Sequence, residues 1–302
     1  MDLKELLSNT IRDYQLPKAG PELFIAVDLD GTMTHHDMSV SPRVITAVQE
    51  HLAAGTNLVI CTGRGIVGAQ VAMEQLGIES GYAVCSNGAI VLAVGDTRKA
   101  HSETTLREIS PTARQENPPV FLLQAHTFNP SSDIEILSRE LPAAIMAVES
   151  IDDMRRITAE FPPGELSGES IIVPLAKLSH PEATRLTVRV PELSAQELLT
   201  KIAELGLHGV EYAVGWSAWM DVSPKGITKA TGLADVLKTL KISQENTVAI
   251  GDSGNDREML RWAKLGVAMG NAPEYVAQWA NIQTADVQHD GAALVLEALL
   301  RN

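Results

Sequence analysis

Cysteine is scarce in this sequence. Only Cys61 and Cys85 occur among 302 residues, and they form no Cys-x-x-Cys pair, so a structural zinc site has no support. Each cysteine lies within an apolar run, where a small buried side chain is a better interpretation than half of a disulfide. Two unpaired thiols are typical of a protein from a reducing compartment.

Clusters of basic residues are also missing. Lys and Arg number 24 against 38 Asp and Glu, which gives a formal net charge of −14. Proteins that bind the phosphate backbone of nucleic acids normally present a basic face, so we expect no nucleic-acid partner. An acidic surface weakly repels a phosphate ester, and any phosphate chemistry must therefore depend on a local metal and local donors.

Long apolar segments are absent as well. No run approaches the ~18–20 apolar residues that span a bilayer, and residues 1–10 carry Asp2 and Glu5 where a signal peptide would be apolar. We therefore expect a cytoplasmic protein with no membrane partner. A length of 302 residues favours about two domains, whereas nothing in the sequence indicates the oligomeric state.

What the sequence does contain is a set of short apolar runs, each followed by glycine and polar residues. The runs are rich in Val and Ile without polar alternation, which is typical of strands covered on both faces of a parallel sheet. Helix-like segments lie between them, and this alternation predicts a doubly wound, Rossmann-like α/β core. The runs are Leu23–Val27, Leu58–Cys61, Tyr82–Cys85, Thr247–Ile250 and Val267–Met269.

The middle of the chain has a different character. Residues 92–216 hold most of the prolines and mix short strand-like and helix-like segments, with no strand that ends in carboxylates. We therefore predict an α+β cap domain, inserted into the core at these boundaries. The catalytic core then comprises residues 20–91 and 217–302, and residues 1–19 form an N-terminal extension.

Two acidic clusters stand directly after two of the predicted strands. Asp28 and Asp30 belong to Asp-Leu-Asp-Gly-Thr, and Asp252 and Asp256 belong to Gly-Asp-Ser-Gly-Asn-Asp. The carboxyl ends of parallel strands meet at one edge of an open α/β sheet, where ligands bind. Carboxylates that converge there repel one another unless a divalent cation lies among them, and Mg²⁺ prefers such oxygen ligands.

The first cluster has two other interpretations when it is considered by itself. Asp28 and Asp30 resemble the start of a calcium loop, but the further acids of an EF-hand are absent. They are also compatible with a turn in which Asp and Gly satisfy local backbone groups. The second acidic cluster favours the metal site over both.

Donors for a phosphate follow at the same predicted edge. Thr62-Gly63-Arg64 follows a strand and precedes a helix, whose free N–H groups suit an anion together with the Thr62 hydroxyl. Lys229 lies in the first turn of a later helix, where an ammonium can meet a phosphate oxygen. An isolated helix lysine is usually solvated, so only the presence of the other motifs favours a phosphate-binding role for Lys229.

The order of these motifs resembles the four motifs of the haloacid dehalogenase (HAD) superfamily, most closely its Cof-type sugar-phosphate phosphatases. The family pattern, laid on Pro224–Ala230, selects Lys229 rather than Lys225, with Ala230 where glycine is usual. The room for a full domain between Thr62 and Lys229 resembles the C2 cap arrangement, and the strand–helix mix suggests its B subtype.

The resemblance implies an Mg²⁺-dependent phosphatase that hydrolyses a small phosphate monoester, with a sugar phosphate as the first expectation. It implies that Asp28 is the nucleophile that forms an aspartyl-phosphate and that Asp30 is the general acid and base. The implied Mg²⁺ ligands are Asp28, the Asp30 carbonyl, Asp252 and, directly or through water, Asp256. The implied phosphate ligands are Thr62, Gly63, Lys229 and Asn255. Arg64 and Asn87 are weaker candidates for substrate contact.

Two alternative functions share much of this pattern. Sugar phosphomutases of the same superfamily have the same core and cap type, although the short spacing from Asp252 to Asp256 is more like that of the phosphatases. A non-catalytic sugar-phosphate-binding protein is the other alternative, and it predicts loss of Asp28 or Asp30. Activation by a bisphosphate would indicate the mutase, and binding without turnover would indicate the binding protein.

Overall fold

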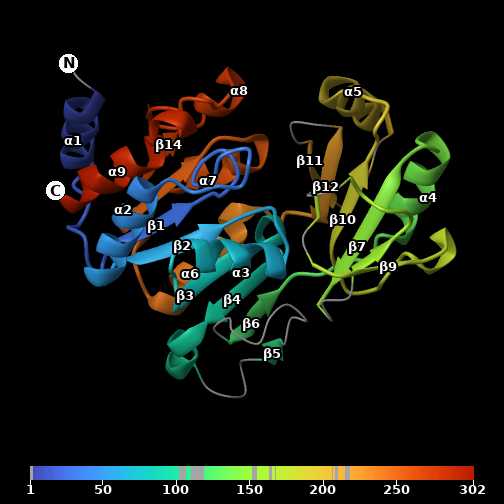
Figure 1. The fold of residues 1–302 in the computed structure, drawn as a ribbon, viewed down its shortest axis with the longest axis horizontal. Coiled ribbons are helices and arrows are strands. Elements are labelled where there is room, and N and C mark those ends of the chain that lie inside the picture. Colours follow the sequence, from blue (N-terminus) through green and yellow to red (C-terminus); the bar gives the residue numbers. More distant parts are fainter. Residues whose placement is uncertain are drawn as a thin grey trace.

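The computed structural model describes residues 3–101, 107–109, 119–151, 155–162, 165–166, 168–205, 207, 210–214 and 218–302. Two β-sheets dominate this part of the chain, and helices pack on both (Figure 1). The two termini lie together at the end of the larger sheet that is remote from the smaller one (Figure 1). No helix among the described residues combines the length and the apolar character that a membrane span requires.

The larger sheet has nine strands in the order β15-β14-β13-β1-β2-β3-β4-β6-β5. The strands from β15 to β3 are parallel, which confirms the predicted doubly wound core, and β4, β6 and β5 continue the sheet in antiparallel pairing. The strands are β1 Phe24–Val27, β2 Asn57–Cys61, β3 Gly81–Cys85, β4 Ile90–Val94, β5 Arg107–Ile109, β6 Val120–Ala125, β13 Thr247–Gly251, β14 Leu265–Ala268 and β15 Ile282–Gln283.

Helices on both faces explain why the core strands are apolar without alternation. In β1, Ile25 and Val27 join one hydrophobic cluster, whereas Phe24 and Ala26 join a second. Successive side chains of a strand point to opposite faces, so each face of β1 has its own cover. The first cluster is covered by α1 (Leu3–Asp13), α2 (Pro42–Ala53), α3 (Ile66–Gln75) and α9 (Gly291–Leu300), and the second by α6 (Lys229–Leu240), α7 (Arg257–Trp262) and α8 (Glu274–Ala277).

The N-terminal extension contributes to the first of these clusters. Leu7 and Ile11 of α1 are buried in it, and α1 packs against α9. The side-chain amide of Asn302 donates to the carbonyl of Leu16 at 2.9 Å, which ties the end of the chain to the extension. Residues 3–19 therefore stabilise the fold far from the edge that carries the acidic clusters.

The smaller sheet has six strands in the order β11-β12-β10-β7-β8-β9. Helices α4 (Ser131–Glu140) and α5 (Ala195–Leu205) cover one face through a third hydrophobic cluster, so this part has the predicted α+β character. The other face carries polar side chains toward the core. The strands are β7 Ile145–Ser150, β8 Arg155–Ile157, β9 Ser170–Ile172, β10 Ala183–Arg189, β11 Val210–Val214 and β12 Trp219–Pro224.

Sheet membership differs from the predicted domain boundaries at both ends of the insertion. The larger sheet includes β4 and β6, so it extends through Ala125 rather than ending at residue 91, and the smaller sheet includes β12, so it extends to Pro224. The predicted boundary rested on strands that are followed by carboxylates, and the antiparallel strands β4 and β6 lack that signal, although β4 is fully buried. The predicted end at residue 216 lies outside the described residues.

Gly88, in the loop after β3, joins the sheet to the start of α6. Its φ is +100°, and a Cβ at this position would lie 1.9 Å from the carbonyl oxygen of Thr228, the residue before α6. Gly55 has a similar φ of +80°, but a Cβ there would meet nothing closer than 3.9 Å. A comparison of substitutions at the two glycines therefore separates the cost of a left-handed backbone from the cost of a steric collision.

We predict that Gly88→Ala lowers the free energy of unfolding by about 1–3 kcal/mol more than Gly55→Ala, because only the first overpacks against backbone. Urea denaturation of the two variants measures the difference. Equal losses in the two variants would contradict the close approach of α6 to the loop after β3.

Candidate active site

The site lies where the loops after the parallel strands meet. Asp28 follows β1, Thr62 follows β2, Asn87 follows β3 and Asp252 follows β13. All four side chains are buried. The chain therefore brings polar groups from widely separated segments to one edge of the larger sheet.

A buried ammonium joins two of the carboxylates. The Nζ of Lys229 donates to Asp28 Oδ1 at 2.5 Å and to Asp256 Oδ1 at 2.6 Å, and the lysine side chain is fully buried. Burial alone would lower the pKa of Lys229, but the carboxylates of Asp256 and Asp28 outweigh it and raise the pKa. The lysine therefore stays charged, and its competitor Lys225 is exposed.

The second oxygen of Asp256 shapes the loop that follows β13. Asp256 Oδ2 accepts hydrogen bonds from the backbone N–H groups of Asp252 and Ser253, each at 2.9 Å. This carboxylate closes the turn on itself, in the manner of a capping box. Both oxygens of Asp256 are thus engaged by groups of the protein.

Asp252 has one oxygen bound and one without a partner. Asp252 Oδ2 accepts from the side-chain amide of Asn271 at 2.9 Å, whereas Oδ1 is buried with no hydrogen-bond partner among the described residues. The same amide of Asn271 donates to the carbonyl of Gly31 at 2.9 Å. Asn271 therefore joins the loop after β1 to the loop after β13 and aims Asp252.

Three carboxylates meet in this volume. Ligand oxygens of Asp28, Asp252 and Asp256 all lie within 4.8 Å of one another. Burial raises the pKa of Asp28, and repulsion from Asp256 raises it further. Burial likewise raises the pKa of Asp252, with Asp28 as the next cause. A buried carboxylate oxygen without a partner, set among repelling acids, fits a divalent cation.

Amide and hydroxyl groups border the carboxylates. Thr62 is buried, and its Oγ accepts from the N–H of Arg64 at 3.1 Å, which leaves the hydroxyl hydrogen available to donate. The side-chain amide of Asn255 donates to Asn87 Oδ1 at 2.8 Å. A Cβ on Gly63 would lie 3.0 Å from the same oxygen, so the peptide at Gly63 runs beside these amides.

Asp30 and Arg64 form a pair of their own at the mouth of the site. The guanidinium of Arg64 grips the carboxylate of Asp30 with Nε at 2.9 Å from Oδ2 and with Nη2 on Oδ1. The Asp30 side chain is 53% exposed, unlike the buried Asp28. Arg64 was predicted to contact substrate, and in this structure it contacts the predicted acid and base instead.

A family model for haloacid dehalogenase-like hydrolases matches residues 25–296 of the chain. This chain belongs to the haloacid dehalogenase-like hydrolases. The assignment confirms the superfamily that the motif order resembles, and it accords with the position of the acidic residues at the carboxyl edge of the sheet.

Known HAD proteins resemble the chain over nearly its whole length. Pyridoxal phosphate phosphatase YbhA from Escherichia coli K12 is 28% identical, over 89% of this chain and 95% of its own. The 5-amino-6-(5-phospho-D-ribitylamino)uracil phosphatase YitU from Bacillus subtilis 168 is 25% identical, over 90% and 96%. The solved structure of the HAD subclass IIB sugar phosphatase BT4131 has a TM-score of 0.69 at 19% identity, over 91% and 98%. The predicted Cof-type branch and enzyme class, a HAD-type phosphatase, are thereby confirmed, while the B subtype of the cap stays a prediction.

Several residues of this HAD site had no role assigned from the sequence. Asn271 stands in a Gly-Asn-Ala stretch shortly after β14, but an amide after a strand does not by itself indicate what it holds. Asp221 of β12 accepts from the Asn87 amide at 3.4 Å, and Arg185 of β10 donates to the carbonyl of Gly63. The last two come from the cap, and strand alternation there is the signal that places them on its polar face.

The two candidate lysines allow a direct test of the buried network. We predict that Lys229→Met lowers the free energy of unfolding by about 3–5 kcal/mol near neutral pH, because it leaves two buried carboxylates without their cation. The loss should shrink as the pH falls, since protonation of the carboxylates removes their repulsion. Lys225→Met is the matched control, and as an exposed substitution it should change stability by less than about 0.5 kcal/mol.

Urea denaturation at several pH values measures both variants. A stability of Lys229→Met equal to that of Lys225→Met would show that the ammonium is not required to hold the acidic residues together.

Proposed function

We propose that the protein is an Mg²⁺-dependent hydrolase that removes phosphate from a small phosphorylated metabolite through an aspartyl-phosphate on Asp28. The observation that carries the proposal is the pairing of the buried Asp28 with Lys229 beside the unpartnered oxygen of Asp252. A carboxylate is a weak nucleophile, so its reaction with phosphorus depends on positioning and on neutralised charge. This site offers both within one network.

In this proposal Asp28, Asp252 and the backbone carbonyl of Asp30 would hold the Mg²⁺. Asp256 was predicted as a possible direct ligand, but its oxygens are engaged by Lys229 and by two backbone N–H groups. We therefore assign Asp256 to holding Lys229 and the loop rather than to direct contact with the metal. When bound, Mg²⁺ supplies positive charge that offsets the carboxylates and the phosphate oxygens.

The chemistry then divides between two carboxylates. An oxygen of Asp28 attacks phosphorus and the bond from phosphorus to the ester oxygen breaks, while Asp30 gives a proton to that leaving oxygen. In the second step Asp30 takes a proton from a water molecule, which attacks phosphorus and releases Asp28. Such acid–base help is typically worth about 10²–10⁴-fold in rate.

The phosphate oxygens meet donors throughout both steps. We propose that the Thr62 hydroxyl, the Gly63 N–H and Lys229 hold these oxygens as charge shifts among them. Asn255 is bound to Asn87, and we assign Asn255 to phosphate contact and Asn87 to its orientation. Preorganised donors cost no rearrangement at the moment of reaction, which is why a buried, already bonded network suits this task.

The pairing of Asp30 with Arg64 adds a condition to this mechanism. Arg64 engages both oxygens of Asp30 in the structure, so neither oxygen is open to a leaving group. Arg64 must therefore turn from Asp30 toward the substrate before Asp30 protonates a leaving oxygen. This movement would bring Arg64 to the substrate, as predicted, and would free Asp30 to act as the general acid.

A small ester is the substrate class that the proposal names. YbhA and YitU are named for phosphate esters of unlike structure, so the relatives support a phosphorylated metabolite without choosing one. A sugar phosphate remains our first expectation, and it awaits a test against other esters. We also propose that the protein acts in the cytoplasm.

Phosphate release from a panel of phosphorylated metabolites, with Mg²⁺ and with EDTA, tests the proposal. We predict that release needs the metal, and that Asp28→Asn abolishes it, because an amide cannot form the acyl phosphate. Asp96→Asn is the matched control, since Asp96 is 78% exposed and lies outside the site. Full turnover by Asp28→Asn would overturn the nucleophile, and turnover only with an added bisphosphate would indicate a mutase.

The raised pKa values of Asp28 and Asp252 predict competition between Mg²⁺ and protons. A carboxyl whose pKa is raised holds a proton at pH values where an ordinary Asp is ionised, and the metal must displace that proton. Mg²⁺ affinity should therefore fall as the pH is lowered from about 8 to about 6, with protons released on binding. Calorimetry in buffers of different ionisation enthalpy counts those protons.

In this experiment Asp252→Asn should bind Mg²⁺ weakly and release fewer protons than the wild type. An affinity that is constant across the pH range would contradict a site built on these two carboxylates.

A further inference from the structure

The cap reaches the phosphate-binding loop of the core through a buried arginine. Arg185 lies on β10, its side chain is only 4% exposed, and its Nη1 donates to the backbone carbonyl of Gly63. The other nitrogens of the guanidinium are held by Glu149 of β7, with Nη2 to Oε1 at 2.8 Å and Nε to Oε2 at 3.2 Å. The guanidinium thus cannot turn without breaking three contacts.

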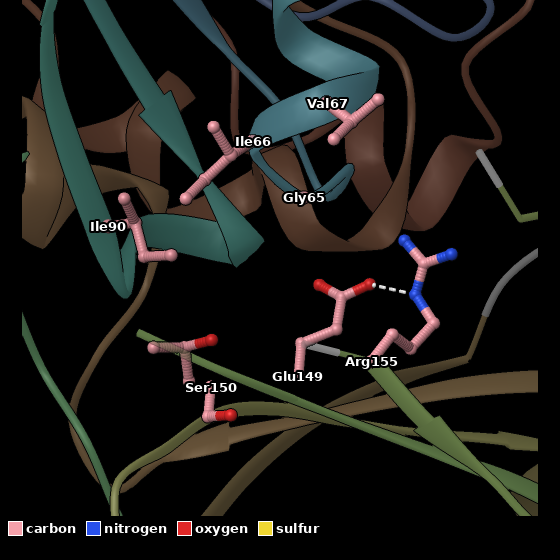
Figure 2. A pocket seen from close by; sticks show the side chains of 8 residues that line it. Gly65, Ile66, Val67, Ile90, Glu149, Ser150 and Arg155 are labelled. Atoms are coloured by element: carbon pink, nitrogen blue, oxygen red, sulfur yellow. Dashed lines mark hydrogen bonds and ion pairs between the residues drawn. The ribbon is translucent and has the colours of Figure 1, made fainter. Parts of the chain in front are cut away.

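Glu149 itself lies against the core. Its Oε2 is 2.7 Å from the position that a Cβ on Gly65 would occupy. Gly65 is the N-cap residue of α3 and offers no side chain to cap the helix. A carboxylate near the first turn of a helix is stabilising, because the free N–H groups there are partially positive. Figure 2 shows Glu149 and Arg155 of the cap beneath Gly65, with a cavity between the two domains.

These charges balance one another within the cap. Burial alone would raise the pKa of Glu149, but Arg185 and Arg155 outweigh it and hold the pKa at about 2. Asp221 lies 3.6 Å from the Arg185 guanidinium and also accepts from Asn87 of the core. Glu149 therefore stays ionised beside Arg185, and the arginine is held in place rather than free to bind an anion.

The contact with Gly63 acts on a specific peptide. The Gly63 carbonyl and the Arg64 N–H belong to the same planar unit, so fixing the carbonyl fixes the direction of the N–H. That N–H donates to Thr62 Oγ at 3.1 Å. With its oxygen engaged as an acceptor on this side, the Thr62 hydroxyl directs its hydrogen away from the Arg64 N–H.

We propose that Arg185 is a positioning residue, which holds the Gly63–Arg64 peptide and thereby orients the Thr62 hydroxyl as a phosphate donor only while the cap is closed on the core. Glu149 keeps Arg185 in place and rests on Gly65. The assignment rests on the proposed function for the identity of the anion, whereas the contacts themselves do not depend on any ligand. Cap closure and the completion of the phosphate site are then one event.

The first test compares two cap arginines that are each paired with a glutamate. Arg185→Met removes the contact with Gly63, and Arg139→Met removes a pair on α4 whose arginine is 66% exposed. We expect Arg185→Met to weaken Mg²⁺-dependent binding of orthovanadate about 10–100-fold, as loss of a hydrogen bond from a charged group does. The kcat/KM for para-nitrophenyl phosphate should fall by a similar factor, and Arg139→Met should match the wild type in both.

Two further measurements separate positioning from folding. Binding of Mg²⁺ alone should stay within about twofold in Arg185→Met, because Arg185 touches none of the proposed ligands, and a general loss of structure would weaken it. Arg185→Lys keeps the charge but cannot grip Glu149 and reach Gly63 together, so it should lie between Arg185→Met and the wild type. Orthovanadate binding and turnover in Arg185→Met equal to those of the wild type would overturn the proposal.

The second test uses the close approach at Gly65. Its φ of −72° is ordinary, so Gly65→Ala strains no backbone and collides only with Glu149. We expect Gly65→Ala to weaken orthovanadate binding and to lengthen the distance between the domains, as measured by resonance energy transfer between labels on α2 and α5. Adding Glu149→Asp, which shortens the side chain by one methylene, should restore part of the orthovanadate binding and part of the wild-type interdomain distance.

The two tests also separate this inference from the proposed function. If the wild type neither binds orthovanadate nor hydrolyses any ester, the proposed function fails, and the role of Arg185 toward a phosphate fails with it. The interdomain distances then decide whether Arg185 and Glu149 hold the cap closed at all. Unchanged interdomain distances in Arg185→Met and Gly65→Ala would show that Arg185 and Glu149 do not hold the cap closed.

Discussion

The repulsion among buried carboxylates is the constraint on which the rest of this structure depends. Asp28 is 4% exposed, and Asp252, Asp256 and Lys229 are fully buried, so solvent screens their charges little. One ammonium cannot balance three carboxylates. The protein meets part of the excess by binding both oxygens of Asp256 and by raising the pKa of Asp28 and Asp252. The unpartnered oxygen of Asp252 fits the divalent cation that we propose for the remainder.

A parallel sheet is suited to holding such a cluster together. Asp28 and Asp252 each stand at the end of a strand whose neighbours fix its position, since β1 pairs in parallel with both β13 and β2. Glycines allow the loops to approach, and a Cβ on Gly31 would lie 2.4 Å from Asp252 Oδ2. The cost of bringing like charges together is thus offset by the packing of two hydrophobic clusters that lie behind the site, and loss of that packing would release the acids.

The sequence predicted the core of the site better than its surroundings, for a physical reason. Asp28 and Asp252 follow apolar strands, and the geometry of a parallel sheet alone brings them to one edge. The partner of Arg64 was not predictable in the same way, because a long side chain can reach several groups. The cap residues Arg185 and Glu149 were beyond local patterns, since strand alternation indicates which face they share but not that the face docks on Gly63 and Gly65.

That docking has a consequence for how specificity and catalysis are joined. A cap that contacted only the substrate would contribute binding energy to ground state and transition state alike. Contact with the backbone at Gly63 instead makes the phosphate donors themselves depend on closure, so energy from the distant part of a substrate is converted into rate, which is the more effective use of binding. A substrate that fails to close the cap would then lose turnover and not merely affinity.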